Sequence, residues 1–253
     1  MPDFEKIVIA NWKMKLGVKE SLDLAESFKK SLGDTSLKEL VVCPDFLSLA
    51  QVGQILDNTS LKLGSQDMFW EESGSYTGEV SPRNLKGLGC SYTILGHSER
   101  RQYLSEDYQM INRKLRAALD QGLSPIMCIG ETKQDKEEGR RDEVLESQLR
   151  QGLENVKFHK DRTLIVAYEP VWAIGSGEAI EEKDIQEAYK VIKLVLKGLF
   201  EEDADNVLTI YGGSVTSENV DRFSNSKEID GLLLGGASLK AEEFFKIAQS
   251  MLK

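Results

Sequence analysis

The chain has 253 residues, 40% of them hydrophobic, which is enough apolar material for a sizeable core. Its formal net charge of −10 excludes the basic surface of a nucleic-acid-binding protein, so any anionic ligand must be bound by local groups. Three widely spaced cysteines (Cys43, Cys90, Cys128) and two histidines (His97, His159) show no metal-ligand spacing, which disfavours a disulfide framework or metal site and fits a reducing compartment.

The N-terminal residues Met1–Lys6 are charged and lead directly into an apolar run, which does not resemble a signal peptide. No apolar run approaches the length of a membrane span. We therefore expect a cytoplasmic protein that has no membrane or nucleic-acid partner and uses no metal or cofactor.

Short apolar runs rich in β-branched residues recur along the chain. They are Ile7–Ala10, Leu40–Val42, Leu61–Gly64, Tyr92–Leu95, Pro125–Ile129, Leu164–Ala167, Val207–Ile210 and Gly231–Leu234. Nearly continuous apolar strands indicate burial on both faces and therefore parallel pairing. Amphipathic segments such as Ile185–Leu196 lie between them and predict helices.

Eight strands alternating with helices, without a linker or a composition break, predict an α/β fold, a single-domain (β/α)8 TIM barrel spanning residues 1–253. A doubly wound open sheet is the alternative, but its edge strands would be more polar than these runs. The charge-dense segment Lys133–Arg150 is interpreted as a solvated helix face.

Polar residues follow several runs, at the strand ends where a barrel of this kind carries its chemistry. Asn11 and Lys13 follow the first run. His97 follows the fourth, at a predicted helix start with Ser98 as its cap. Backbone N–H groups at that helix start would oppose protonation of the imidazole.

Glu169 ends the sixth run, and Pro170 follows at once, where it removes a backbone donor and ends regular pairing. The next residues, up to Gly177, are mostly small and surround Trp172, which suits a movable lid. The pattern predicts a base at a rigid strand end beside this lid. An ordinary strand-to-helix turn with a solvated Glu fits this segment equally well, and the other motifs decide between them.

Glycine pairs follow the seventh and eighth runs, at Gly212-Gly213 and Gly235-Gly236. Paired glycines let the backbone approach a ligand closely, and helix starts there would point N–H groups at an anion. One pair alone is commonly just a turn, but two pairs at these positions indicate a phosphate site.

A phosphate site, a lysine, a histidine and a glutamate together suggest one chemistry. A carboxylate base can remove a proton beside a carbonyl group, and Lys13 with a neutral His97 can stabilise the resulting enediolate. The sequence therefore predicts proton transfer on a small phosphorylated carbonyl compound.

Motifs in one order along the whole chain resemble the triosephosphate isomerase family. They are Asn11–Met14, Gly78–Pro82, Ile94–Arg101, Cys128–Glu131, the segment around Glu169, Tyr211–Ser214 and Leu234–Leu239. The resemblance implies an isomerase that interconverts dihydroxyacetone phosphate and D-glyceraldehyde 3-phosphate through an enediol(ate), in glycolysis and gluconeogenesis.

The resemblance also implies roles for individual residues. Glu169 would carry a proton between C1 and C2, His97 would act as the neutral electrophile, and Lys13 would be the cation near the substrate. Asn11 would help to position the substrate, with Glu99 as a polar partner. Backbone N–H groups would bind the phosphate at Gly175, Ser214, Gly235 and Gly236, and Tyr211 and Ser214 would latch the closed lid.

The family is usually dimeric through a loop that here runs from about Asp67 to Glu79. Thr77 matches the position that reaches the neighbouring active site, so we expect a homodimer through the loop around Thr77. This chain departs from the family pattern at three places: Asp67 where Asn is frequent, Ser176 where Thr is commoner, and the hinge Glu178–Ile180, which lacks the usual basic residue.

Two other functions fit this sequence less well than the isomerase. A sugar-phosphate epimerase on the same fold often needs several His and Asp metal ligands, whereas this chain has only two histidines. A barrel kept as a binding or scaffold protein would be expected to have lost a catalytic residue or the lid, but Lys13, His97, Glu169 and the lid are all present.

Overall fold

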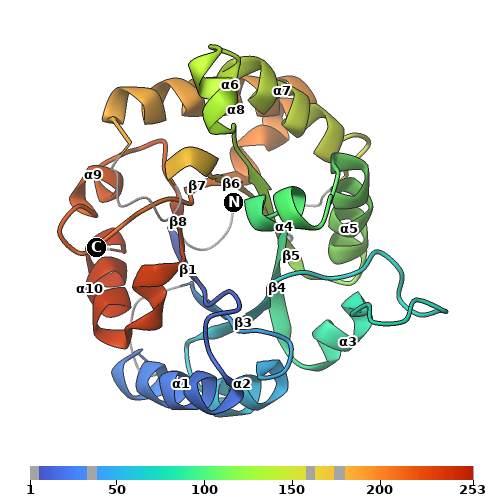
Figure 1. Cartoon of the computed structure of the whole chain (residues 1–253), viewed down its shortest axis with the longest axis vertical. Coiled ribbons are helices and arrows are strands. Elements are labelled where there is room, and N and C mark those ends of the chain that lie inside the picture. The colour runs from blue at the N-terminus through green and yellow to red at the C-terminus, as the bar shows by residue number, and fades with distance from the viewer. Residues whose placement is uncertain (1–5, 33–38, 158–162, 174–179, 253) are drawn as a thin grey trace.

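The structure is a computed structural model that describes residues 6–32, 39–157, 163–173 and 180–252. Eight parallel strands form a closed barrel in chain order, and the last strand pairs with the first. Helices surround the barrel (Figure 1). The closed order confirms the predicted (β/α)8 barrel and rules out the open doubly wound sheet, because a closed barrel has no edge strands.

The strands lie where the apolar runs predict them, with small differences at their ends. They are β1 Ile7–Asn11, β2 Leu40–Cys43, β3 Lys62–Ser65, β4 Cys90–Leu95, β5 Ser124–Ile129, β6 Leu164–Tyr168, β7 Val207–Tyr211 and β8 Gly231–Leu234. The helices are α1 Val18–Leu32, α2 Leu49–Leu56, α3 Pro82–Gly87, α4 Ser98–Tyr103, α5 Tyr108–Asp120, α6 Lys133–Glu137, α7 Arg141–Gly152, α8 Glu182–Phe200, α9 Asp221–Ser224 and α10 Ala241–Met251.

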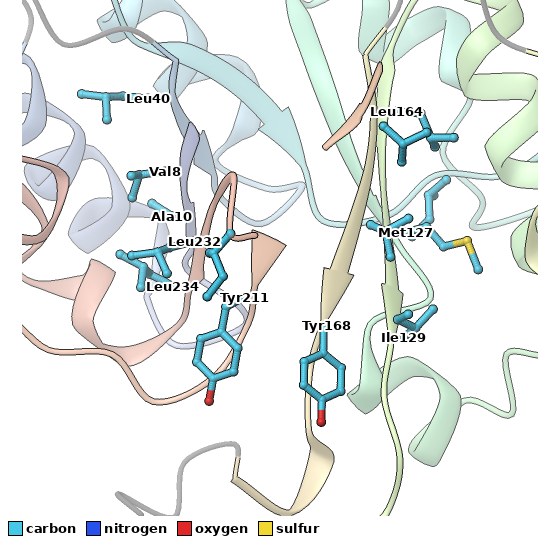
Figure 2. Close-up of a cluster of buried hydrophobic side chains, with 14 of the residues drawn as sticks. Val8, Ala10, Leu40, Met127, Ile129, Leu164, Tyr168, Tyr211, Leu232 and Leu234 are labelled. Atoms are coloured by element: carbon cyan, nitrogen blue, oxygen red, sulfur yellow. The ribbon is translucent and has the colours of Figure 1, made fainter. Parts of the chain in front are cut away.

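Alternate side chains of a strand pack into different apolar layers. In β1, Ile7 and Ile9 belong to one cluster with residues from the other strands, whereas Val8 and Ala10 belong to a larger cluster that includes the helices. Figure 2 shows part of the larger cluster. Burial on both faces explains why the strand sequences are continuously apolar rather than alternating.

Most side chains of the segment Lys133–Arg150 are exposed as predicted, but Leu145 and Leu149 are buried, and the segment forms two helices. Gly139 lies between α6 and α7 with a φ of 69°, in the left-handed region that glycine adopts without steric cost. The first of the two helices begins at a capping box in which Thr132 and Asp135 satisfy each other's backbone N–H groups.

Asp67, Glu106 and Lys114 form a buried charge cluster, with the partly exposed Arg100 at its edge. Lys114 Nζ lies 2.8 Å from Asp67 Oδ1 and 2.6 Å from Glu106 Oε1. Arg100 lies 2.8 Å from each of the same two carboxylates. Burial raises the pKa of Asp67 to about 6, against the attraction of Lys114. The cluster ties the start of the loop that contains Thr77 to α4 and α5.

Gly231 marks the point where β8 closes against β1. A Cβ there would overlap the Ile7 carbonyl oxygen, so we expect Gly231→Ala to lower the free energy of unfolding by about 1–3 kcal/mol. Gly198 is the control, because it is exposed within α8 and a Cβ there would meet no atom within 4 Å. Gly198→Ala should raise stability by about 0.5–1 kcal/mol. Urea unfolding at one protein concentration measures both, and equal effects would contradict the steric argument.

Candidate active site

A cavity of about 690 Å³ opens at the carboxyl ends of the strands, lined by residues that follow β1, β4, β6, β7 and β8. Eight of the residues predicted from the sequence line it: Asn11, Lys13, His97, Glu99, Glu169, Ser214, Gly235 and Gly236. Gly175 lies outside the described residues. The barrel thus brings together side chains that are far apart in the sequence.

Glu169 follows the last residue of β6 and is only 2% exposed. Its Oε1 atom lies 3.3 Å from His97 Nε2, and its Oε2 atom accepts a hydrogen bond of 3.4 Å from the Ser98 backbone N–H. A buried carboxylate that faces a cavity and has few partners is available as a base.

Two glycines make room for Glu169. A Cβ at Gly130 would overlap the Glu169 carbonyl oxygen, and a Cβ at Gly212 would lie 2.7 Å from Glu169 Cγ. The Glu169 N–H also donates to the Ile129 carbonyl at 2.7 Å, directly beside Gly130. Glu169 is therefore placed by close backbone contact on one side and by the loop after β7 on the other.

The Gly130 peptide is itself held by two side chains from the surrounding helices. Gln148 on α7 accepts from the Gly130 N–H at 2.8 Å and donates to its carbonyl at 3.1 Å, as a neighbouring strand would. Arg101 on α4 donates to the Gly130 carbonyl at 3.3 Å and to the Cys128 carbonyl at 2.8 Å. These bonds extend the order of β5 beyond its last paired residue.

Lys13 has a φ of 52°, in the left-handed region, which costs a residue with a side chain about 1–3 kcal/mol. Asn11 Oδ1 accepts from the Lys13 N–H at 3.1 Å, and Gln66 Nε2 donates to the Lys13 carbonyl at 2.9 Å. Strain that neighbouring groups enforce is typical of functional sites. Here it accompanies a Lys13 side chain that lines the cavity, with Nζ 2.8 Å from Glu99 Oε1.

His97, not Ser98, caps α4, so the cap predicted from the sequence was wrong. The His97 ring accepts a hydrogen bond of 3.3 Å at Nδ1 from the Glu99 N–H. Ser98 lies one position further on, as the first helical residue, and its N–H faces Glu169. Because Nδ1 acts as an acceptor, the proton of a neutral imidazole lies on Nε2, the atom that faces Glu169.

Glu99 pairs with Lys13 at the wall of the cavity. Partial burial opposes ionisation of its carboxyl group, but the hydrogen bond from Lys13 and the charges nearby outweigh that effect. The net result is a pKa of Glu99 below its ordinary value. Glu99 therefore stays ionised and keeps the Lys13 ammonium group in a defined place.

The glycine pair after β8 leaves space beside the Lys13 side chain. A Cβ at Gly235 would lie 3.3 Å from Lys13 Cε, and a Cβ at Gly236 would meet no atom within 4 Å. The Ser238 hydroxyl donates to the Gly235 carbonyl at 2.6 Å, which stabilises the short 3₁₀ helix Gly236–Leu239. This open, glycine-lined wall is suited to an anionic group.

The first residues of the predicted lid, up to Ala173, are bonded to the barrel. Trp172 Nε1 donates to Glu131 at 2.8 Å, and burial raises the pKa of that carboxyl group. The Ser214 hydroxyl donates to the Ala173 carbonyl at 3.1 Å. Tyr211 lies beside Tyr168 at the strand ends (Figure 2), but the lid residues that it was predicted to latch lie outside the described part of the chain.

No group of three His, Cys, Asp or Glu side chains in the described ranges could hold a metal ion. Within the same ranges, no helix combines the length and the apolar character that crossing a membrane requires.

Two residues that hydrogen-bond the backbone of the site, Gln148 and Gln66, could not be assigned from the sequence. Gln148 lies in the charged segment interpreted as solvated, and only its spacing of three residues from Leu145 and four from Gly152, both buried, indicates that it faces inwards. Gln66 follows β3, and its bonds to the carbonyls of Lys13 and Cys43 depend on the closed barrel. Neither residue carries a charge or a motif that marks it.

The closed barrel and the ionisable groups at its carboxyl end define the class of protein, a (β/α)8-barrel enzyme. The family model described as triosephosphate isomerase matches residues 6–251, and the chain belongs to this family. It is therefore an aldose–ketose isomerase.

Curated relatives cover nearly the whole chain, and each is named triosephosphate isomerase. The protein from Dictyoglomus turgidum is 44% identical over 97% of this chain and 99% of its own length. The protein from Herpetosiphon aurantiacus is 45% identical over 96% of this chain and 98% of its own. That from a Thermoanaerobacter species is 44% identical over 95% of this chain and 97% of its own.

Gln148→Met removes both hydrogen bonds to Gly130 while keeping a similar volume. Because a misplacement of the base near 1 Å can lower the rate by about 10²-fold, we expect kcat to fall by about ten- to a hundredfold with little change in KM. Gln151→Met is the control, since Gln151 is exposed on the same helix and bonds only Ser147. A variant that loses thermal stability but keeps wild-type kcat would limit Gln148 to a structural role.

Proposed function

We propose that this protein interconverts dihydroxyacetone phosphate and D-glyceraldehyde 3-phosphate, as a step of glycolysis and gluconeogenesis. The observation that carries the proposal is the buried Glu169 carboxylate, 3.3 Å from His97 Nε2, in one cavity with Lys13. Membership of the family supports a phosphorylated triose as substrate.

Glu169 removes a proton from C1 of the ketose as the base of the reaction. Its buried position suits this role, because water does not compete for the carboxylate. The electron pair of the C–H bond forms the C1–C2 double bond, and the carbonyl oxygen becomes the enediolate oxygen. Glu169 then returns the proton to C2, while the C1 hydroxyl gives up its proton and the oxygen on C2 gains one by way of the His97 ring. The C1–O bond thereby becomes the new carbonyl group, the base is regenerated and no redox partner is consumed.

His97 donates its Nε2 proton towards the carbonyl oxygen, while Lys13 offsets the negative charge that develops there. The Nδ1 acceptor bond from the Glu99 N–H keeps that proton on Nε2. Asn11 keeps the Lys13 backbone in place through its Oδ1 atom, and in this scheme it also helps to position the substrate.

The phosphate group binds at the loops after β7 and β8, through backbone N–H groups of Ser214, Gly235 and Gly236. The open space beside Gly236 and the nearby Lys13 ammonium group support this placement. Gly175 contributes a further N–H from the lid in this scheme. Local donors of this kind are needed because the chain as a whole carries a charge of −10.

Glu169→Asp tests the assignment of the base. The change keeps the carboxylate but withdraws it by one methylene, so we expect turnover to fall by about 10²-fold while KM changes little. A coupled assay of triose phosphate interconversion in the presence of a chelator measures both constants. Wild-type protein without activity would reject the proposed function, and a fully active Glu169→Asp variant would assign the base elsewhere.

We further propose a homodimer that forms through the loop around Thr77. Residues 71–79 of this loop are exposed throughout, and the loop projects away from the barrel (Figure 1). Large apolar side chains are exposed in this loop, after β1 and β2, and at the end of α4: Tyr76, Met14, Phe46, Leu47, Tyr103 and Leu104. In the proposed dimer, association of two chains covers these apolar side chains together with the loop around Thr77.

Leu47→Glu tests the dimer. Leu47 is 83% exposed in the single chain, so a charge there is harmless in a monomer but is buried in the proposed interface. We expect wild-type protein to sediment at twice the chain mass of 28.3 kDa, and Leu47→Glu to shift towards the monomer with loss of activity. Leu194→Glu, on α8 and 73% exposed, should leave both unchanged. A fully active wild-type monomer at micromolar concentration would refute the dimer.

The cytoplasm is the compartment that we propose. All three cysteines are free and buried, which fits a reducing environment.

A further inference from the structure

Glu243 lies at the rim of the active-site cavity, in the first turn of α10. Its carboxylate reaches the loop after β7: Oε1 accepts from the Ser217 N–H at 2.7 Å, and Oε2 accepts from the Ser217 hydroxyl at 2.9 Å. Since α10 follows the glycine pair of β8, this double hydrogen bond joins the two loops on which the proposed phosphate site depends.

The loop after β7 transmits that connection to Ser214. Asn219 Oδ1 accepts from the Thr216 N–H at 2.9 Å, and Asn219 Nδ2 donates to the Ser214 carbonyl at 3.4 Å. Residues 214–219 therefore form one internally bonded turn. Because the turn is bonded within itself, holding Ser217 in place also holds Ser214 in place at the cavity wall.

A carboxylate on the wall of an anion site is electrostatically unfavourable, because it repels the ligand. Within the described residues Glu243 forms no ion pair that would neutralise it. The dipole of α10 favours a negative charge in its first turn, and both carboxylate oxygens are engaged by Ser217. Its contribution to the site is therefore expected from geometry rather than from charge.

We propose that Glu243 is a positioning residue for substrate binding, which sets the spacing between the phosphate-binding loops after β7 and β8. The proposal rests on the proposed function of this cavity. Glu243 acts through Ser217 and makes no contact with the proton-transfer groups, so its loss weakens binding of the phosphate group without slowing the chemical step.

Three substitutions separate this positioning from a simple effect of charge. Glu243→Ala removes both hydrogen bonds and one negative charge. Glu243→Gln removes the charge but can keep both bonds, because its amide oxygen accepts from the Ser217 N–H and its amide nitrogen donates to the Ser217 hydroxyl. Glu242→Ala removes the same charge from the exposed neighbouring residue, which does not line the cavity.

We expect Glu243→Ala to raise KM and the inhibition constant of inorganic phosphate by about five- to tenfold, at unchanged kcat, as the loss of one or two hydrogen bonds predicts. Glu243→Gln and Glu242→Ala should keep both constants at or slightly below the wild-type values. Ser217→Ala, which removes one of the two bonds, should lie between Glu243→Ala and wild type.

The outcomes are distinguishable from failure of the proposed function, which wild-type turnover tests separately. A fall in KM and in the phosphate constant for Glu243→Ala, to the level of Glu242→Ala, would show that Glu243 acts only through its charge. A fall in kcat of the same size as the rise in KM would show general loss of structure. Either result overturns the proposal, and Glu243→Gln remains informative if Glu243→Ala does not fold.

Discussion

The site depends on one contact, the approach of the Gly130 peptide to the backbone of Glu169. A side chain at residue 130 would overlap the Glu169 carbonyl, and the adjacent Ile129 carbonyl accepts the Glu169 N–H at 2.7 Å. The ends of β5 and β6 are thereby locked at a separation that only a glycine permits. The Gln148 side chain on α7 supports the same peptide from outside the barrel, so the position of Glu169 is set by packed backbone and by a hydrogen-bonded helix residue.

The cavity combines a strained backbone at Lys13 with a Lys13 ammonium group that an ion pair with Glu99 keeps in place. Lys13 keeps its left-handed conformation because Asn11 and Gln66 bond both sides of its peptide, and its ammonium group rests against Glu99. Fixed groups of this kind need little rearrangement when charge develops on a substrate. An acidic protein can therefore present a local environment that suits an anion, although its overall field opposes one.

The fold was predictable because a buried parallel strand needs apolar residues on both faces, and eight such runs are unmistakable. The residues that face the cavity were predictable because strand ends in a barrel converge. Local detail was harder to predict. His97 and Ser98 are adjacent and both can cap a helix. Which of them is the cap depends on where the backbone leaves β4 and the first helical turn begins. Gln148 hydrogen-bonds the Gly130 peptide, eighteen residues away in the sequence, and no local sequence pattern predicts such a contact.

The charge cluster of Asp67, Arg100, Glu106 and Lys114 constrains how this sequence can diverge. Replacing one member leaves the remaining charges unbalanced in a largely buried site, which is destabilising, whereas replacing compatible members together can be neutral. Single substitutions are therefore disfavoured even where the final combination would be acceptable. Sequences descended from this one should retain the four residues as a set or exchange several of them at once, because their charges couple the loop after β3 to α4 and α5.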